Sequence, residues 1–211
     1  MVFLFSSVMC TVEIPQLFLP KFGLNSQQLG LQFLGIIIGT VIGEQLGGNL
    51  SDWWMRWRAK KTNARPAAEF RLWLSYSGFL LTVCGLVVFL VQTQNATTGH
   101  WNVTPIVGVA IAAAGNQIVT TVLITYAIDC HMDQAASIGV FVNFVRQIWG
   151  FIGPFWLPDM FANVGVANSA GVVAALVIGV SIIPTVILHF RGEHWRKRKL
   201  ARALPGQGIT A

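Results

Sequence analysis

The sequence predicts an all-α membrane protein whose chain crosses a bilayer six times. Of its 211 residues, 54% are hydrophobic and only 10% are charged, whereas soluble domains carry about 25% charged residues. The apolar residues also gather into six segments, each close to the roughly 20 residues that a helix needs to cross a bilayer. A soluble fold of this size could not bury so much apolar surface, so we expect one helical unit without a soluble domain.

The six apolar segments are expected to be helices, because lipid offers no hydrogen-bond partner to an open backbone. They cover about 2–19, 28–47, 70–92, 103–127, 134–157 and 167–190. We therefore predict a six-span domain over 1–190 and a basic tail over 191–211. The first segment lacks a basic start and a small-x-small cleavage site, so no cleavable signal peptide is expected.

The second span has a glycine at every fourth position and ends in an aromatic and basic stretch. Its glycines share one helix face, which predicts close packing against a neighbouring helix; they are Gly35, Gly39, Gly43 and Gly47. The stretch that follows reads GGNLSDWWMRWRAKK over 47–61. Tryptophans at the interface with Lys and Arg beyond them are typical of a helix that leaves a membrane on the cytoplasmic side.

Two clusters, over 56–71 and 191–202, hold twelve of the fourteen Lys and Arg. Six spans place both termini and the loop between the second and third spans on one side, so the two clusters lie on the same side. That side is predicted to be the cytoplasm, and anionic lipid headgroups rather than nucleic acid are the expected partners of the clusters. On the opposite side, the sequon Asn95-Ala-Thr is the better expected glycosylation acceptor, since Asn102-Val-Thr lies closer to the membrane.

Polar residues at membrane depth are candidate functional residues, because a charged side chain there costs roughly 2.5–3.5 kcal/mol on insertion scales. In the fifth span, Asn143, Arg146 and Gln147 share one helical face with Gly139 and Gly150. Such a face is expected to line a water-filled cavity or to meet a polar partner. Either Arg146 binds an anion or neutralises a carboxylate in a transport pathway, or it forms a structural ion pair between helices.

Two other spans carry candidate residues. In the first span Glu13 precedes Pro15, and a carboxylate in apolar surroundings has a raised pKa that suits proton transfer near neutral pH. The alternative is that Glu13 only pairs with Arg146 or lies near the lumenal interface. In the fourth span, Asn116 and Gln117 either bind a substrate or form hydrogen bonds between helices.

Motifs of enzymatic chemistry are absent from the sequence. There is no GxSxG, no HExxH, no P-loop and no GxGxxG that opens a helix after a strand. The segment Asp129-Cys-His131-Met-Asp133 has only a superficial likeness to a metal site, since it is predicted to form the short turn between the fourth and fifth spans. We therefore expect no enzyme, no cofactor and no metal.

The stretch over 48–58 resembles the cytoplasmic loop motif of the major facilitator superfamily, G-x-L-A/S-D-x-x-G-R/K. Its residues Gly48, Asp52 and Arg56 match the motif, whereas Met55 replaces the second glycine and Trp53 stands where the first cation is usual. The stretch also lies where that superfamily places it, between the second and third helices of a six-helix half. The resemblance implies that the three matching residues belong to a cytoplasmic gate that stabilises the outward-facing state.

Five other stretches are similar to the C-terminal half of fungal members in the drug:proton antiporter-like branch, at 28–34, 68–72, 125–129, 143–147 and 153–155. The resemblance implies a proton-coupled exporter of a small organic molecule, of which this chain is the C-terminal half. A complete member has twelve helices, with its substrate site between two halves. In such a transporter Glu13 is the candidate proton carrier, and the residues expected to line the central cavity are Asn116, Gln117, Asn143, Arg146 and Gln147.

The missing N-terminal half is then an expected partner, together with substrate and protons. Met1 stands almost inside the first span, which suits a truncated gene model, with a self-paired half-transporter as the alternative. A second hypothesis is a non-transporting assembly or regulatory subunit that kept the fold. The plasma membrane is the expected location rather than the vacuole or another internal membrane.

Overall fold

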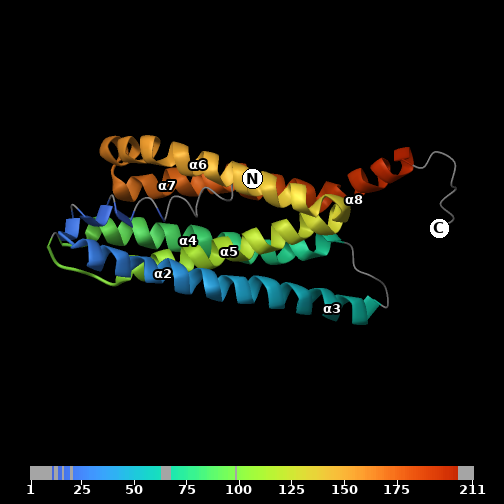
Figure 1. Ribbon diagram of the computed structural model, residues 1–211, viewed down its shortest axis with the longest axis horizontal. Helices are drawn as coiled ribbons and strands as arrows, with labels where there is room; N and C mark the ends of the chain where they lie inside the picture. Colours follow the sequence, from blue (N-terminus) through green and yellow to red (C-terminus); the bar gives the residue numbers. More distant parts are fainter. Residues whose placement is uncertain are drawn as a thin grey trace.

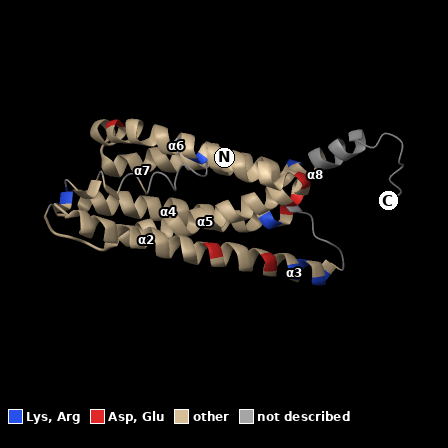
Figure 2. Ribbon diagram, viewed as in Figure 1, with Lys and Arg blue, Asp and Glu red and all other residues tan. Residues whose placement is uncertain are grey.

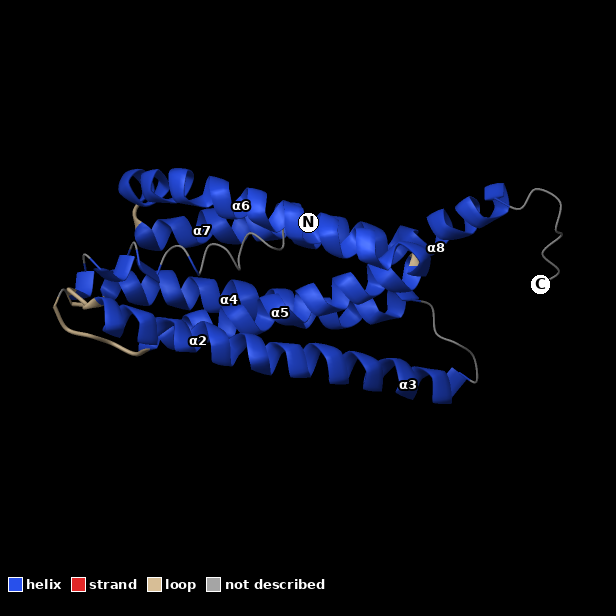
Figure 3. Cartoon of the chain, viewed as in Figure 1, coloured by secondary structure: helices blue, strands red, loops and turns tan. Residues whose placement is uncertain are grey.

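The structure, a computed structural model, describes residues 11, 14–15, 17–19, 21–62, 68–97 and 99–203. Within this part of the chain every regular element is a helix and no strand occurs (Figure 3). In chain order the elements are α2 (Ser26–Gln45), η2 (Leu46–Leu50), α3 (Ser51–Thr62), η3 (Ala68–Leu72), α4 (Trp73–Asn95), α5 (Thr104–Cys130), η4 (Met132–Gln134), α6 (Ala135–Val164), α7 (Val166–Leu176), η5 (Val177–Ile182) and α8 (Ile183–Ala203). The predicted fold class is confirmed.

Five continuous helical segments among the described residues are long and apolar enough to cross a membrane. They are Ser26–Thr62, Glu69–Asn95, Thr104–Cys130, Met132–Val164 and Val166–Gly192, and they correspond to the second to sixth predicted spans. Most of the first predicted span, 2–19, and its candidate Glu13 lie outside the described residues. The sixth crossing therefore stays a prediction.

The second predicted span does not end at Gly47, because α2, η2 and α3 form one helix from Ser26 to Thr62 (Figure 1). Its 37 residues give a length of about 55 Å at 1.5 Å per residue, well beyond a hydrocarbon core of about 30 Å. The π-helical η2 carries the chain through Gly47 and Gly48 without a turn. No glycine or proline follows until Pro66, so nothing breaks the helix over the basic residues 56–61 that the sequence placed in a loop.

Helix α5 packs between α2 and α4 (Figure 1), and glycines bring the three backbones together. A methyl group added at Gly43 of α2 would lie 2.9 Å from Cα of Ala114, and one added at Gly85 of α4 would lie 2.7 Å from Cα of Ala112. Real Cβ atoms do not approach so closely. The close packing predicted from the glycine face of the second span is confirmed.

A second layer, made of α6 and of α7, η5 and α8, lies against α4 and α5 (Figure 1). An apolar cluster joins the layers, with Phe89 of α4, Leu157 of α6 and Val173 of α7 fully buried. Charged residues gather towards the end of the bundle where α3 and α8 lie, which we call the charged end, and they are sparse elsewhere (Figure 2). This contrast makes any polar feature in the middle of the bundle conspicuous.

Candidate functional site: a central polar cavity and a charged network

A cavity of about 340 Å³ lies between α2, α5 and α6, within the roughly 300–1,000 Å³ typical of small-molecule sites. Gln117 is the middle residue of α5, so the cavity lies at the depth of the centre of the bundle. Its walls consist of Glu44 from α2, of residues from α5 and of residues from α6, namely Gln117, Thr120, Thr121, Ile124, Thr125, Gly139, Val142, Asn143 and Arg146. Polar groups dominate this list, so we call the feature the polar cavity.

The structure brings three of the five predicted substrate-contacting residues to the polar cavity. Gln117 projects from α5, while Asn143 and Arg146 project from α6, where a three-residue spacing keeps them on one face. Gln147 is exposed and Asn116 is buried, and neither lines the cavity. Consecutive helical residues point about 100° apart. In each pair of sequence neighbours, one residue (Gln117 or Arg146) therefore faces the cavity and the other does not.

Glu44 also lines the cavity, although it lies in an apolar predicted span and was not among the candidate residues. The amide Nε2 of Gln117 and the hydroxyl Oγ1 of Thr121 both donate to Oε2 of Glu44, the latter at 2.9 Å. The neighbouring Gly43 packs against α5, which brings the carboxylate within reach of these donors. The available signal was that Glu44 is the sole acid between positions 28 and 47.

Arg146 presents a half-buried guanidinium to the same cavity. Its Nε is buried and has no hydrogen-bond partner among the residues that the structure describes. A buried donor left without a partner costs about 1–3 kcal/mol, so a ligand or water that accepts from Arg146 would be favoured. Arg71, by contrast, forms two ion pairs, with Asp52 and with Asp129.

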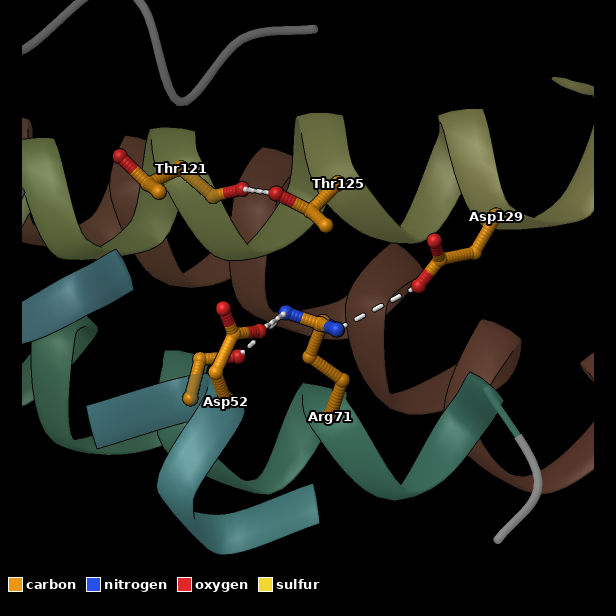
Figure 4. Close-up of polar contacts among 6 residues, drawn as sticks. Asp52, Arg71, Thr121, Thr125 and Asp129 are labelled. Carbon is orange, nitrogen blue, oxygen red and sulfur yellow. Dashed lines mark hydrogen bonds and ion pairs between the residues drawn. The ribbon is translucent and has the colours of Figure 1, made fainter. Parts of the chain in front are cut away.

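Arg71 is the centre of a charged network towards the charged end of the bundle (Figure 4). Its Nη1 donates to Oδ1 of Asp52 at 3.0 Å and to Oγ of Ser51 at 2.9 Å. Its Nε lies 3.4 Å from Oδ2 of Asp129. The Arg71 side chain is 12% exposed, against 54% for Asp52 and 30% for Asp129. The network thus joins α3, η3 and the end of α5.

The cation that pairs with the motif aspartate is therefore Arg71, which the sequence did not single out. Asp52 and Arg56 stand four residues apart on one helix, a spacing at which opposite charges often pair, but Arg56 is exposed. The third motif residue, Gly48, is not in close contact with any neighbour, because a Cβ added there would meet no atom within 4 Å. The sequence signals for Arg71 were its place in the basic cluster over 56–71 and its position in the stretch 68–72 that resembles the family.

The predicted glycosylation site lies at the opposite end of the bundle. Asn95 is the exposed last residue of α4, whereas Oδ1 of Asn102 accepts hydrogen bonds from the backbone N–H and the hydroxyl of Thr104. Nearby, Nζ of Lys21 donates to the carbonyl of Gln94 at 2.7 Å, and partial burial lowers the pKa of the Lys21 ammonium. Glycosylation of Asn95 stays a prediction.

No protein-family model and no solved structure matches the chain, but fungal transporters are similar to it. A protein of Schizosaccharomyces pombe described as an uncharacterized transporter is 30% identical over 167 residues, which is 79% of this chain and 33% of that protein. The probable drug/proton antiporter YHK8 of Saccharomyces cerevisiae is 29% identical over 177 residues, 84% of this chain and 33% of its own. The MFS-type transporter oryF of Aspergillus oryzae is 28% identical over 170 residues, 80% of this chain and 34% of its own.

The chain thus spans about a third of the length of these relatives. Its helices, its partial loop motif and a central polar cavity between helices all agree with the kinship. The chain belongs to the major facilitator superfamily of transporters.

Proposed function

We propose that this chain is the C-terminal six-helix half of a proton-coupled secondary transporter that exports a small organic molecule. The observation that carries the proposal is the polar cavity at the middle depth of an otherwise apolar bundle. A relative named as a probable drug/proton antiporter supports proton coupling. Because the chain spans about a third of such relatives, a second six-helix half is needed to complete the cavity.

The proposed substrate contacts are the cavity-lining members of the predicted set. Gln117 and Asn143 can donate and accept hydrogen bonds, and Arg146 offers a charged donor that has no described partner for its Nε. Glu44 adds one carboxylate to the same walls. A substrate that carries hydrogen-bonding groups and an acceptor for Arg146 fits this combination. Glu13 keeps its proposed role as the proton carrier.

We also propose that the charged network is the cytoplasmic gate, with Arg71 rather than Arg56 as its central cation. Arg71 holds Asp52 of α3 and Asp129 of α5, so separation of these helix ends breaks both ion pairs. Rocking of the two halves would break and re-form them. The protein then lies in the plasma membrane with its charged end towards the cytoplasm. On that side the basic clusters bind anionic lipid headgroups.

The test is transport by the full-length gene product in a yeast strain stripped of its own efflux pumps. Accumulation of a panel of cationic, anionic and neutral fluorescent dyes is measured with and without a proton gradient. Arg146→Ala and Glu13→Gln should each abolish gradient-dependent efflux. Gln147→Ala, which alters an exposed neighbour on the same helix, should leave efflux unchanged.

Unchanged gradient-dependent transport in both Arg146→Ala and Glu13→Gln would contradict these residue assignments. A full-length protein that reaches the membrane but moves none of the dyes, whatever the gradient, would favour the non-transporting subunit instead.

A further inference from the structure

A second cavity, of about 240 Å³, lies between α5, α6 and the helix formed by η5 and α8. In contrast to the polar cavity, its walls are mainly aliphatic and contain no charged side chain. Its polar lining residues carry hydroxyl groups only, and they are Tyr126, Ser181 and Thr185. Ile124 and Val142 line both cavities. The apolar cavity, as we call it, is thus separated from the polar cavity by two side chains.

One polar group in this apolar wall lacks a partner. Ser181 is 4% exposed, lines the cavity, and its Oγ has no hydrogen-bond partner among the described residues. Buried hydroxyls are seldom left in this state, and each case calls for an explanation.

Two other buried hydroxyls in the same helical segment form hydrogen bonds that Ser181 does not form. Oγ of Ser169 donates to the carbonyl of Gly165 at 2.7 Å, and Oγ1 of Thr185 donates to the carbonyl of Ser181 at 2.8 Å. Both bond back one turn along their own helix. Ser181 lies instead in the π-helical η5, a kind of segment that is frequent at functional sites.

We propose that the apolar cavity is a second ligand site, for a small neutral molecule that is mostly apolar and carries one hydroxyl or carbonyl oxygen. The aliphatic walls favour burial of the apolar part, and the unpartnered Ser181 hydroxyl makes the polar contact. A charged ligand is disfavoured, because nothing in the described walls would neutralise it. The volume suffices for a medium-chain alcohol, since an engineered cavity of about 150 Å³ already binds benzene.

The probe is a photoreactive octanol with a diazirine on its chain, added to the full chain in phosphatidylcholine nanodiscs. Labelled residues are identified by mass spectrometry, and unlabelled 1-octanol competes. Saturable labelling of the segments 123–127 and 180–188 is expected. Because one hydrogen bond contributes about 0.5–1.5 kcal/mol, Ser181→Ala should raise the half-saturating concentration about 2- to 12-fold, the equivalent change in binding constant. Ala127→Phe, which fills the cavity, should abolish saturable labelling.

Ser169→Ala is the matched control, because it removes a buried serine hydroxyl outside the cavity and should not change labelling. Since Ser181→Ala removes an unpartnered group, it should not lower the melting temperature, which separates lost binding from misfolding. Two sources of the ligand are then distinguished by adding a sterol to the nanodiscs: competition points to a membrane lipid, and its absence points to a freely diffusing molecule. Labelling that does not saturate, or a half-saturation that neither Ser181→Ala nor Ala127→Phe changes, overturns the proposal.

Discussion

Replacing Arg71 with glutamine tests the charged network most sharply, because it removes the cation while keeping a polar side chain. Arg71 bridges Asp52 of α3 and Asp129 of α5 and donates to Ser51 as well. A hydrogen bond to a charged group contributes about 1.5–3 kcal/mol, but an exposed ion pair contributes only about 0.2–1 kcal/mol. Both carboxylates are partly exposed, so screening places these contacts near the lower range.

We therefore expect Arg71→Gln to lower the free energy of unfolding by about 1–2 kcal/mol, a factor of about 5–30 in the folding equilibrium. The assay is equilibrium unfolding of the purified chain by SDS in mixed micelles, followed by tryptophan fluorescence. The control is Arg56→Gln, the same chemical change at an exposed position, which should stay within about 0.5 kcal/mol of the original protein.

A double-mutant cycle with Asp129→Asn isolates the pair between Arg71 and Asp129. The cycle should give a favourable coupling that weakens at 1 M salt, where the Debye length falls from about 10 Å at 0.1 M to about 3 Å. Strictly additive effects of Arg71→Gln and Asp129→Asn, or an Arg56→Gln variant as unstable as Arg71→Gln, would refute the reasoning.

Three further predictions concern packing, modification and the cavity. Gly43→Val should destabilise the chain by at least about 1–3 kcal/mol in the same titration, because its side chain would overpack α5, whereas Gly48→Ala meets no atom within 4 Å and should be tolerated. Asn95→Gln should abolish the endoglycosidase-sensitive shift of the protein on a gel, and Asn102→Gln should retain it. Thr121→Val removes one donor to the cavity carboxylate and should cost about 1 kcal/mol, measured by the same unfolding titration.

The elements of this fold were predictable because membrane helices depend on local composition. Apolar length alone located the five helical segments that the structure describes, and glycine spacing in α2 identified its face against α5. The polar face of α6 also predicted that Asn143 and Arg146 would lie together, since helical periodicity fixes which neighbours share a face.

The partners across helices were not predictable in the same way. Glu44 meets Gln117 and Thr121 only through the relative register of α2 and α5, which no local pattern specifies. Arg71 reaches Asp52 from η3, nineteen positions along the chain, and the helical spacing that links Asp52 to Arg56 says nothing of such a contact. Which member of an adjacent polar pair faces a cavity depends on the rotation of the helix, as the buried Asn116 beside Gln117 illustrates.

The account rests on a polar cavity that water can enter at the middle depth of the bundle. The most direct measurement compares Asn143→Cys with Phe144→Cys, in a background whose native cysteines are serine, by their rates of reaction with a membrane-impermeant maleimide. Asn143 lines the cavity, and Phe144 is 61% exposed on an apolar face of the same helix. The thiolate is the reactive form, and each unit by which apolar surroundings raise the pKa of a thiol slows its reaction about tenfold. The account predicts that Asn143→Cys reacts at least about tenfold faster than Phe144→Cys. Equal rates for the two variants would contradict it. So would a failure of Asn143→Cys to react while the control Arg56→Cys, at an exposed position, reacts normally.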